Sequence, residues 1–359
     1  MNDTVNLFIV YSPLHYICSE QIAKVFCRDE RNVLFYIKEE FAGMVQDTCC
    51  AEAVFLPWPR FYPEKGVFGR LQRTLKNLEI VQGYCSGFKT IRIHTPVIDT
   101  EAINYFINHL SRSFPQAQVV VRLIPDGVLN IQRHPLGRVK EALQYVRKVR
   151  RLYSRRLDYY MLRGDRTGSE TAIVDRIYLL PGFPHEYCPD KVVEMPPFHQ
   201  KAGGTAGGVG LRALVIGQPL QRDRRLTEEQ RAELSGALEG YLKRCGMTHV
   251  DYKAHPREAV REFLGAQYTE ITPTEALETF LLHNHYDIVI GIYSTALLTA
   301  RMILPQSSRV ISFGFDQVFY KDQVSKAKVQ SVFEKVGVEM VASREGRAVS
   351  SSSRGSHES

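Results

Sequence analysis

A glycine-rich stretch in the second half of the chain separates two series of alternating strand and helix patterns. Residues 201–210 read KAGGTAGGVG, a composition typical of a flexible link rather than of a helix or strand. On both sides of it, short apolar runs alternate with helical patterns, which indicates parallel sheets covered by helices. The sequence therefore predicts an α/β fold with two Rossmann-like domains, residues 1–200 and 211–322, joined by residues 201–210.

The strand and helix signals can be placed along both halves. Before the link, strands are expected at residues 6–11, 32–37, 52–56, 90–93, 118–124 and 176–180, and helices at 16–26, 69–82 and 99–112. After it, strands are expected at 211–216, 248–252, 268–271, 287–292 and 309–313, and helices at 227–244, 257–264, 274–282 and 295–303. Residues 323–342 are expected to form a C-terminal helix that crosses back to the first domain. The serine-rich residues 343–359 are expected to be disordered.

Composition excludes several classes of protein. The 359 residues suit two domains of about 150 residues each. The seven cysteines form no CxxC pair, so neither a disulfide framework nor a zinc site is expected. No apolar run approaches the ~18 residues that a membrane-spanning helix needs. We therefore expect a cytoplasmic protein.

The formal net charge of +7 is concentrated in one segment. Between residues 138 and 163, Lys and Arg alternate with Leu, Val and Tyr at near-helical spacing. Such a segment can lie against anionic lipid or a polyanionic acceptor, and we expect a peripheral contact with the inner face of the cytoplasmic membrane there. A solvated helix face is the alternative. No nucleic-acid-binding motif accompanies the charge, so nucleic acid is not an expected partner.

A lysine and a histidine follow the expected strand 248–252, in the sequence Lys253-Ala254-His255-Pro256. In open α/β sheets, ligands bind beyond the carboxyl ends of the strands. A cation there can neutralise a phosphate, and an imidazole can donate a proton to it. The pair indicates group transfer from a nucleotide-activated donor.

Other strand ends of the second half carry polar residues. Gly217 permits close backbone approach and Gln218 offers amide hydrogen bonds to a sugar or base, although a plain turn would use the same residues. Ser294 and Thr295 stand where a strand leads into a helix, which makes either an anion site or a capped helix. Glu275 near another helix start either binds ribose hydroxyls or stabilises the helix.

In the first half, Asp126 directly follows an apolar strand, within Pro125-Asp126-Gly127. A carboxylate at a strand end can deprotonate an acceptor hydroxyl, but Pro-Asp-Gly is also a common turn. Ser12 and His15 end the first strand. They can contact the acceptor or a sugar carboxylate, or form a turn with a capping serine.

Taken in order, these residues resemble the bacterial sialyltransferases of GT-B type. The resemblance is nearest to glycosyltransferase family 52, and family 80 and the bacterial polysialyltransferases share the pattern of an acidic residue with glycine, then His-Pro, then a serine or threonine pair. The segments that carry it are Tyr11-Ser12-Pro13-Leu14-His15, Asp126-Gly127, Ile216-Gly217-Gln218-Pro219, Lys253-Ala254-His255-Pro256 and Ser294-Thr295. Two residues depart from the pattern: Pro125 replaces a first acidic residue, so a lone carboxylate stands as the base, and Ala254 replaces a glycine.

The resemblance implies a GT-B fold whose two domains face a cleft, a CMP-linked nine-carbon sugar donor, inversion at the anomeric carbon, and neither metal nor other cofactor. It implies that Asp126 is the general base and His255 the acid that protonates the departing phosphate. The donor side would be formed by Gly217, Gln218, Lys253, Pro256, Glu275, Ser294 and Thr295, and the acceptor or sugar side by Ser12, His15 and Gly127.

The leading hypothesis is therefore a sialyltransferase-like enzyme that acts on a bacterial surface glycan, such as lipooligosaccharide or capsule, and a lipid-linked form of that glycan is a candidate acceptor. One alternative keeps the fold but uses CMP-Kdo or a UDP-sugar as donor. Another is a non-catalytic protein of the same fold that binds polyanions through its basic segment.

Overall fold

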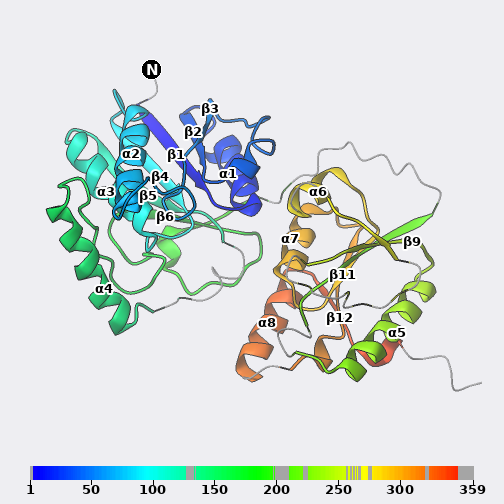
Figure 1. The fold of residues 1–359 in the computed structure, drawn as a ribbon. Coiled ribbons are helices and arrows are strands. Elements are labelled where there is room, and N and C mark those ends of the chain that lie inside the picture. The colour runs from blue at the N-terminus through cyan, green and yellow to red at the C-terminus, as the bar shows by residue number, and fades with distance from the viewer. Residues whose placement is uncertain are drawn as a thin grey trace, which may run out of the picture. The chain divides into compact units, whose positions relative to one another are not determined.

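Two compact units make up the chain, Met1–Pro196 and Pro197–Ser359, and each has its own sheet (Figure 1). The computed structural model describes residues 3–126, 133, 135–196, 198, 210–220, 225–255, 258, 261, 263, 265, 268–273, 277–319 and 323–346. The expected link at 201–210 lies outside these residues except for Gly210.

The first unit is built on a parallel sheet with the strand order β3-β2-β1-β4-β5-β6-β7. Its strands are β1 (Thr4–Val10), β2 (Arg31–Tyr36), β3 (Glu52–Phe55), β4 (Thr90–Thr95), β5 (Gln118–Leu123), β6 (Val174–Leu179) and β7 (Val192–Glu194). Its helices are α1 (Pro13–Phe26), α2 (Gly69–Gly83), α3 (Glu101–Ser113) and α4 (Arg138–Val149), with short 3₁₀ turns η1 (Glu39–Phe41), η3 (Arg150–Leu152) and η4 (Pro189–Lys191).

The second unit repeats this plan with the strand order β10-β9-β8-β11-β12-β13, again parallel. Its strands are β8 (Leu211–Ile216), β9 (Met247–Lys253), β10 (Tyr268–Glu270), β11 (Ile288–Gly291), β12 (Arg309–Phe313) and β13 (Glu339–Val341). Its helices are α5 (Glu228–Arg244), α6 (Leu277–His283), α7 (Thr295–Ile303) and α8 (Gln323–Lys335), with 3₁₀ turns η5 (Phe315–Gln317) and η6 (Ser343–Gly346).

In both sheets the first strand lies in the middle, where the direction of winding reverses. β1 pairs with β2 and β4, and β8 pairs with β9 and β11. In doubly wound folds, the crevice beyond the carboxyl ends of the strands at this switch point is where ligands bind. The predicted α/β fold with two Rossmann-like parallel-sheet units is confirmed.

The central strands are apolar because helices cover both faces of the sheets. Every residue of β1 is buried, which is the pattern expected for a parallel strand. Each unit has its own hydrophobic core. Local signals set the helix starts: Ser12 caps α1, and Thr227 and Gln230 form a reciprocal capping box at α5.

The C-terminal part of the second unit differs from the expectation. The helix expected up to residue 342 ends at Lys335, because Gly337 adopts a left-handed conformation with φ of 81° that stops the helix. The chain then forms β13, which pairs with β12 of the second sheet. Ser343, expected in a disordered tail, is buried, and its backbone N–H donates to Asp316. The expected disorder of residues 347–359 lies outside the described residues.

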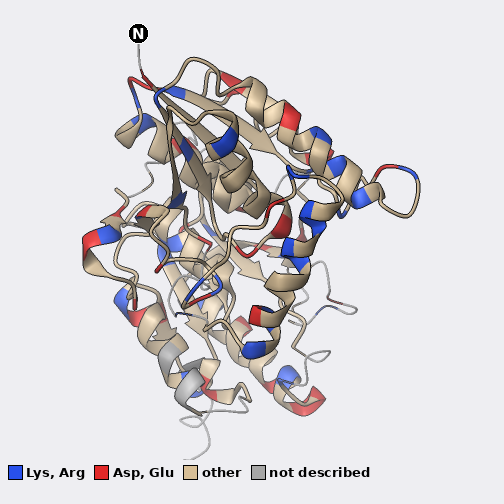
Figure 2. Ribbon diagram, turned by 90° about the vertical axis from the view of Figure 1, so that its left-hand side faces the viewer, with Lys and Arg blue, Asp and Glu red and all other residues tan. Residues whose placement is uncertain are grey.

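Basic and acidic residues are interspersed along the helices and loops (Figure 2). Within the part of the chain that the structure describes, we find no helix with both the length and the apolar character needed to cross a bilayer.

Candidate functional site

The carboxyl ends of three strands in the second unit bring the predicted donor-side segments together. The backbone N–H of Gly217, after β8, donates to the carbonyl of Lys253 at the end of β9, at 2.9 Å. The side-chain oxygen of Gln218 accepts from the backbone N–H groups of Ile292 and Tyr293, after β11, at 3.0 and 2.9 Å. Segments distant in the sequence therefore share one edge of the sheet, at its switch point.

Gln218 has a structural role at this edge of the sheet. Its side chain is buried, and its amide oxygen ties the end of β8 to the loop that leads into α7. The amide oxygen is thus engaged within the protein. A contact from its NH₂ group to a donor remains a prediction.

Glu258 also organises the edge, and sequence analysis did not select it. One carboxylate oxygen accepts from the backbone N–H of His255 at 2.7 Å, and the other accepts from the hydroxyl of Tyr252. A Cβ atom at Gly217 would collide with Glu258 and lie 2.6 Å from the Tyr252 hydroxyl oxygen. The sequence held a signal for this contact. Glu258 lies three residues after His255 and opens a helical pattern, and a glutamate at that position often accepts from the backbone N–H of the residue three before it.

Lys253 is half-buried at the end of β9. Burial lowers the pKa of its ammonium group below the ordinary value, and the nearby Glu278 carboxylate opposes this shift. A cation that has lost part of its hydration gains more from a bound anion than an exposed one does. Lys253 therefore presents a partly desolvated cation at this edge of the sheet, and its contact with a phosphate stays a prediction.

Ser294 is the N-cap of α7. Its backbone is extended and its Oγ accepts from the N–H of Ala296 at 3.2 Å, so Thr295 begins the helix. The interpretation of Ser294 and Thr295 as the start of a capped helix is thus confirmed. The N-terminus of α7, the positive end of its helix dipole, also lies at this edge, where it favours a bound anion. A capped helix and an anion site are therefore compatible here.

Three residues selected from the sequence, Gly127, Pro256 and Glu275, lie outside the described residues. Their assigned roles stay predictions.

In the first unit, the structure pairs two residues that sequence analysis had selected separately. His15 Nε2 lies 2.9 Å from Asp126 Oδ1. The other ring nitrogen, Nδ1, accepts from the backbone N–H of Tyr11 at 3.3 Å. Because Nδ1 is an acceptor, the ring proton is on Nε2 and is donated to the carboxylate.

The two members of this pair differ in exposure. The His15 side chain is 4% exposed, whereas that of Asp126 is 28% exposed. The Tyr11 ring covers His15 edge-on at 5.8 Å between centroids, and Ser12 caps α1 by accepting from the backbone N–H of His15. The carboxylate is therefore the group of this pair that a ligand can reach, and the buried imidazole fixes its position through the hydrogen bond.

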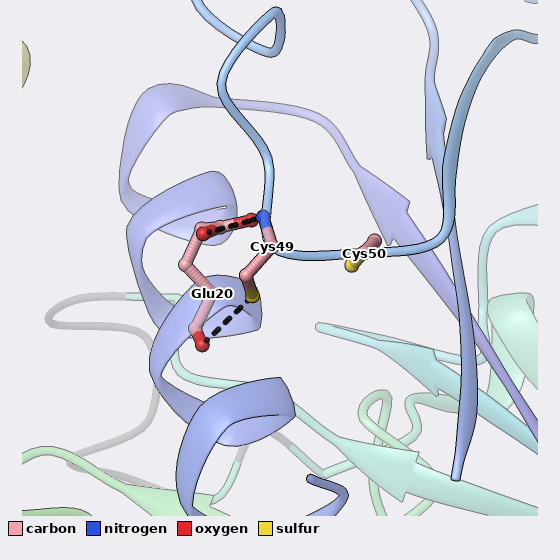
Figure 3. Close-up of side chains that lie close together, drawn as sticks. All are labelled: Glu20, Cys49 and Cys50. Carbon is pink, nitrogen blue, oxygen red and sulfur yellow. Dashed lines mark hydrogen bonds between the residues drawn. The ribbon is translucent and has the colours of Figure 1, made fainter. Parts of the chain in front are cut away.

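Among the described residues, one cluster has donor atoms close enough for a metal ion: Glu20 of α1 with Cys49 and Cys50 (Figure 3). The Glu20 carboxylate already accepts from the backbone N–H of Cys49, at 3.0 and 3.1 Å, and pairs with Lys24 at 3.1 Å. The Cys50 thiol has its pKa raised, first by its hydrogen bond with Cys49 and then by burial, so it resists forming the thiolate that binds metals. The cluster anchors the loop to α1.

One family model matches part of this chain, mostly within the second unit. Residues 182–311 match the family model described as alpha-2,8-polysialyltransferase (POLYST). This range contains Gly217, Gln218, Lys253, His255 and Ser294 but not the His15–Asp126 pair. No curated protein matches this sequence.

Several solved structures are similar along most of the chain. The calicheamicin glycosyltransferase CalG4 has a TM-score of 0.47 and 13% identity, covering 96% of this chain and 92% of that one. The glycosyltransferase of kitacinnamycin has a TM-score of 0.46 and 11% identity, covering 95% and 86%. A putative UDP-N-acetylglucosamine 2-epimerase from Listeria monocytogenes has a TM-score of 0.43 and 11% identity, covering 94% and 88%. These values carry no information about substrate, so the polysialyltransferase match over residues 182–311 is the comparison that bears on function.

Proposed function

We propose that this chain is an inverting glycosyltransferase of GT-B type. It would transfer a sialic acid, or a related nonulosonic acid, from its CMP conjugate to a terminal sugar hydroxyl of a bacterial surface glycan. The observation that carries the proposal is that Lys253 ends β9, His255 follows it and Ser294 follows β11. These two strands flank β8, so the three residues share one edge of the second sheet. The polysialyltransferase match covers the same stretch.

The donor phosphate would bind between Lys253 and the start of α7. The ammonium group supplies a full positive charge, and Ser294 and Thr295 supply hydroxyls at the positive end of the helix. In this proposal these groups, rather than a metal ion, neutralise the phosphate. No cofactor is required.

In the reaction, the acceptor oxygen forms a bond to the anomeric carbon while the bond from that carbon to the phosphate oxygen breaks. The bonding electrons leave with CMP, and His255 donates a proton to the departing phosphate. Attack from the opposite side of the anomeric carbon inverts its configuration. Glu258 supports this step indirectly, because it fixes the backbone of His255 at 2.7 Å.

Asp126 would take the proton of the acceptor hydroxyl. His15 donates its Nε2–H to Asp126 Oδ1, and the proposal assigns the proton of the acceptor hydroxyl to this carboxylate group. In this proposal His15 acts as a positioning residue, and its expected contact with the acceptor or a sugar stays a prediction.

The proposed acceptor is a lipooligosaccharide or capsule glycan carried on a lipid, which the enzyme meets at the inner face of the cytoplasmic membrane. The partners are then a nucleotide-sugar donor and a glycan acceptor.

Nucleotide-dependent stabilisation tests the donor assignment. A ligand that binds only the folded state raises the melting temperature, so CMP should stabilise the wild-type protein and UDP should not. His255→Ala should reduce the CMP effect less than Lys253→Met, because His255 acts on the leaving group in transfer. His249→Ala, an exposed histidine on the same strand, is the matched control.

Two results would redirect the proposal. Stabilisation by UDP and not by CMP would indicate a UDP-sugar donor. Binding of polyanions without stabilisation by any nucleotide would indicate a non-catalytic protein.

A further inference from the structure

Helix α4 turns its polar side into the protein. Lys140 and Arg147 both pair with Asp99, at 3.1 and 2.9 Å, and Gln144 donates to and accepts from the backbone of Leu162. These three side chains recur at helical spacing and occupy one face of the helix. An ordinary surface helix has the opposite arrangement, with polar residues outward.

The face of α4 next to this polar one, about 100° round the helix, is apolar and exposed. Val139 and Val146 are 76% and 60% exposed, and Leu143 lies between them at the same helical spacing. The chain continues into η3, where Leu152 is 82% exposed. This segment was expected to present a basic face. It presents an apolar one instead, because Lys140 and Arg147 point toward the protein and pair with Asp99.

A second element extends this surface. The loop before α2 exposes Val67, at 97%, and Phe68. The ring of Phe68 packs on the ring of Tyr153 with 5.2 Å between centroids, and a cavity of about 950 Å³ is lined by both elements. We call the exposed apolar residues of α4, Leu152 and Tyr153 after it, and Val67 and Phe68 in the loop before α2 the α4 surface.

Exposed apolar side chains are concentrated here. Of the thirteen large hydrophobic residues exposed in the described part of the chain, nine belong to the α4 surface: Val67, Phe68, Val139, Leu143, Tyr145, Val146, Val149, Leu152 and Tyr153. Scattered single hydrophobic residues are normal on a protein surface, but a contiguous group marks an interaction site.

The charge around this surface identifies the partner. Residues 138–163 contain nine Lys or Arg against two acidic residues. Arg138, Arg151 and Arg155 are exposed, and no acidic residue in the described ranges forms an ion pair with them. A second copy of the chain would oppose this charge with its own, whereas anionic lipid headgroups would complement it.

We propose that the α4 surface inserts into the interfacial layer of an anionic lipid bilayer. Val67, Phe68, Val146 and Leu152 enter below the level of the headgroups, and the surrounding arginines contact lipid phosphates. The inference rests on the proposed function in one respect: it assigns to the α4 surface the contact with the membrane that carries the proposed lipid-linked acceptor. Lipid binding itself requires neither donor nor transfer.

Cosedimentation with vesicles tests this directly, in the absence of any sugar nucleotide. The full-length protein should bind vesicles of phosphatidylcholine with phosphatidylglycerol and bind pure phosphatidylcholine weakly. The double variant Val67→Ser/Leu152→Ser should lose at least about tenfold in affinity, since two apolar side chains no longer enter the bilayer. Both positions are highly exposed, so folding should be unaffected, and Val25→Ser/Phe319→Ser is a control at exposed apolar positions elsewhere.

A charge variant separates the two contributions. Arg151→Gln/Arg155→Gln should reduce the preference for phosphatidylglycerol but leave the residual binding that apolar insertion provides. Equal vesicle binding by wild type and Val67→Ser/Leu152→Ser would overturn the proposal. So would a wild-type protein that ignores vesicles and forms a dimer which the same double variant dissociates. Since no transfer is measured, the result is independent of whether the proposed reaction occurs.

Discussion

His15 Nε2 donates a hydrogen bond to Asp126 Oδ1 at 2.9 Å, although the two residues are 111 positions apart in the chain. The buried imidazole has its other nitrogen held by the backbone of Tyr11, so its orientation is fixed from both sides. A carboxylate supported in this way is oriented before substrate arrives, as the general-base role proposed for Asp126 requires.

Substitution at this pair should affect turnover more than donor binding. Asp126→Asn should lower kcat by at least about 100-fold, the contribution typical of a general base. His15→Gln keeps a donor near the carboxylate and should lower kcat less than His15→Phe, which removes it. In both His15 variants the KM for the CMP-sugar should stay unchanged. If His15→Phe instead raised that KM at constant kcat, His15 would contact the donor and would not act through Asp126.

Gly217 should be intolerant of any side chain. Gly217→Ala forces a methyl group against Glu258 and Tyr252, and should lower the free energy of unfolding by about 1–3 kcal/mol, as overpacking does. Gly236→Ala is the control, because it lies in α5 with nothing within 4 Å of its added Cβ atom. Alanine there should raise the free energy of unfolding by about 0.5–1 kcal/mol through its helix propensity. Denaturant titration of both variants measures the contrast, and equal effects would refute the packing described for Gly217.

Lys253→Met should stabilise the protein and weaken nucleotide binding. Burial lowers the Lys253 pKa, so between the folded pKa and 10.5 the unfolded state binds more protons and stability rises with pH. The ammonium group therefore costs stability below that window, and methionine removes the cost. Loss of a charge-assisted contact worth about 1.5–3 kcal/mol should weaken CMP binding more than tenfold. Melting curves with and without CMP test both effects, with the exposed Lys243→Met as control. A variant that is less stable yet binds CMP normally would exclude the phosphate role.

Acid should destabilise the first unit through His94. Burial, reinforced by Arg122, holds the pKa of this fully buried imidazole well below 6.5. Below pH 6.5 the unfolded state takes up a proton that the folded state does not, so stability falls as pH falls, by up to ~1.4 kcal/mol per pH unit. His94→Gln should remove this part of the slope in urea titrations across that range. The exposed His249→Gln should retain it, and parallel slopes for wild type and His94→Gln would contradict the assignment.

Much of the fold was predictable because parallel strands buried on both faces are continuous apolar runs. The strands β8 and β12 and the helix α7 have the predicted bounds. β7 and β13 were missed: a run of three residues carries a weak periodic signal, although β10 of the same length was predicted, and β13 lies within the helix expected up to residue 342. The outward apolar face of α4 could not be predicted, since it depends on Asp99, which lies far from α4 in the sequence.

The site was predictable in part for a related reason. Residues that follow parallel strands share an edge of the sheet, so Gly217, Lys253 and Ser294 could be grouped from the sequence. The pairing of His15 with Asp126 depends on side-chain direction, and the internal use of the Gln218 oxygen depends on a loop that follows another strand. Neither leaves a signal in local spacing.

Product formation tests the central claim most directly. Wild-type protein incubated with CMP-sialic acid and a terminal-galactose glycan should yield, by mass spectrometry, a glycan heavier by one sialic acid residue, together with free CMP. Asp126→Asn and His255→Ala should each abolish this product while their melting temperatures stay close to that of the wild type. Wild-type product formation in either folded variant would contradict the role assigned to that residue. CMP release without a heavier glycan, across a panel of acceptors, would contradict transfer itself.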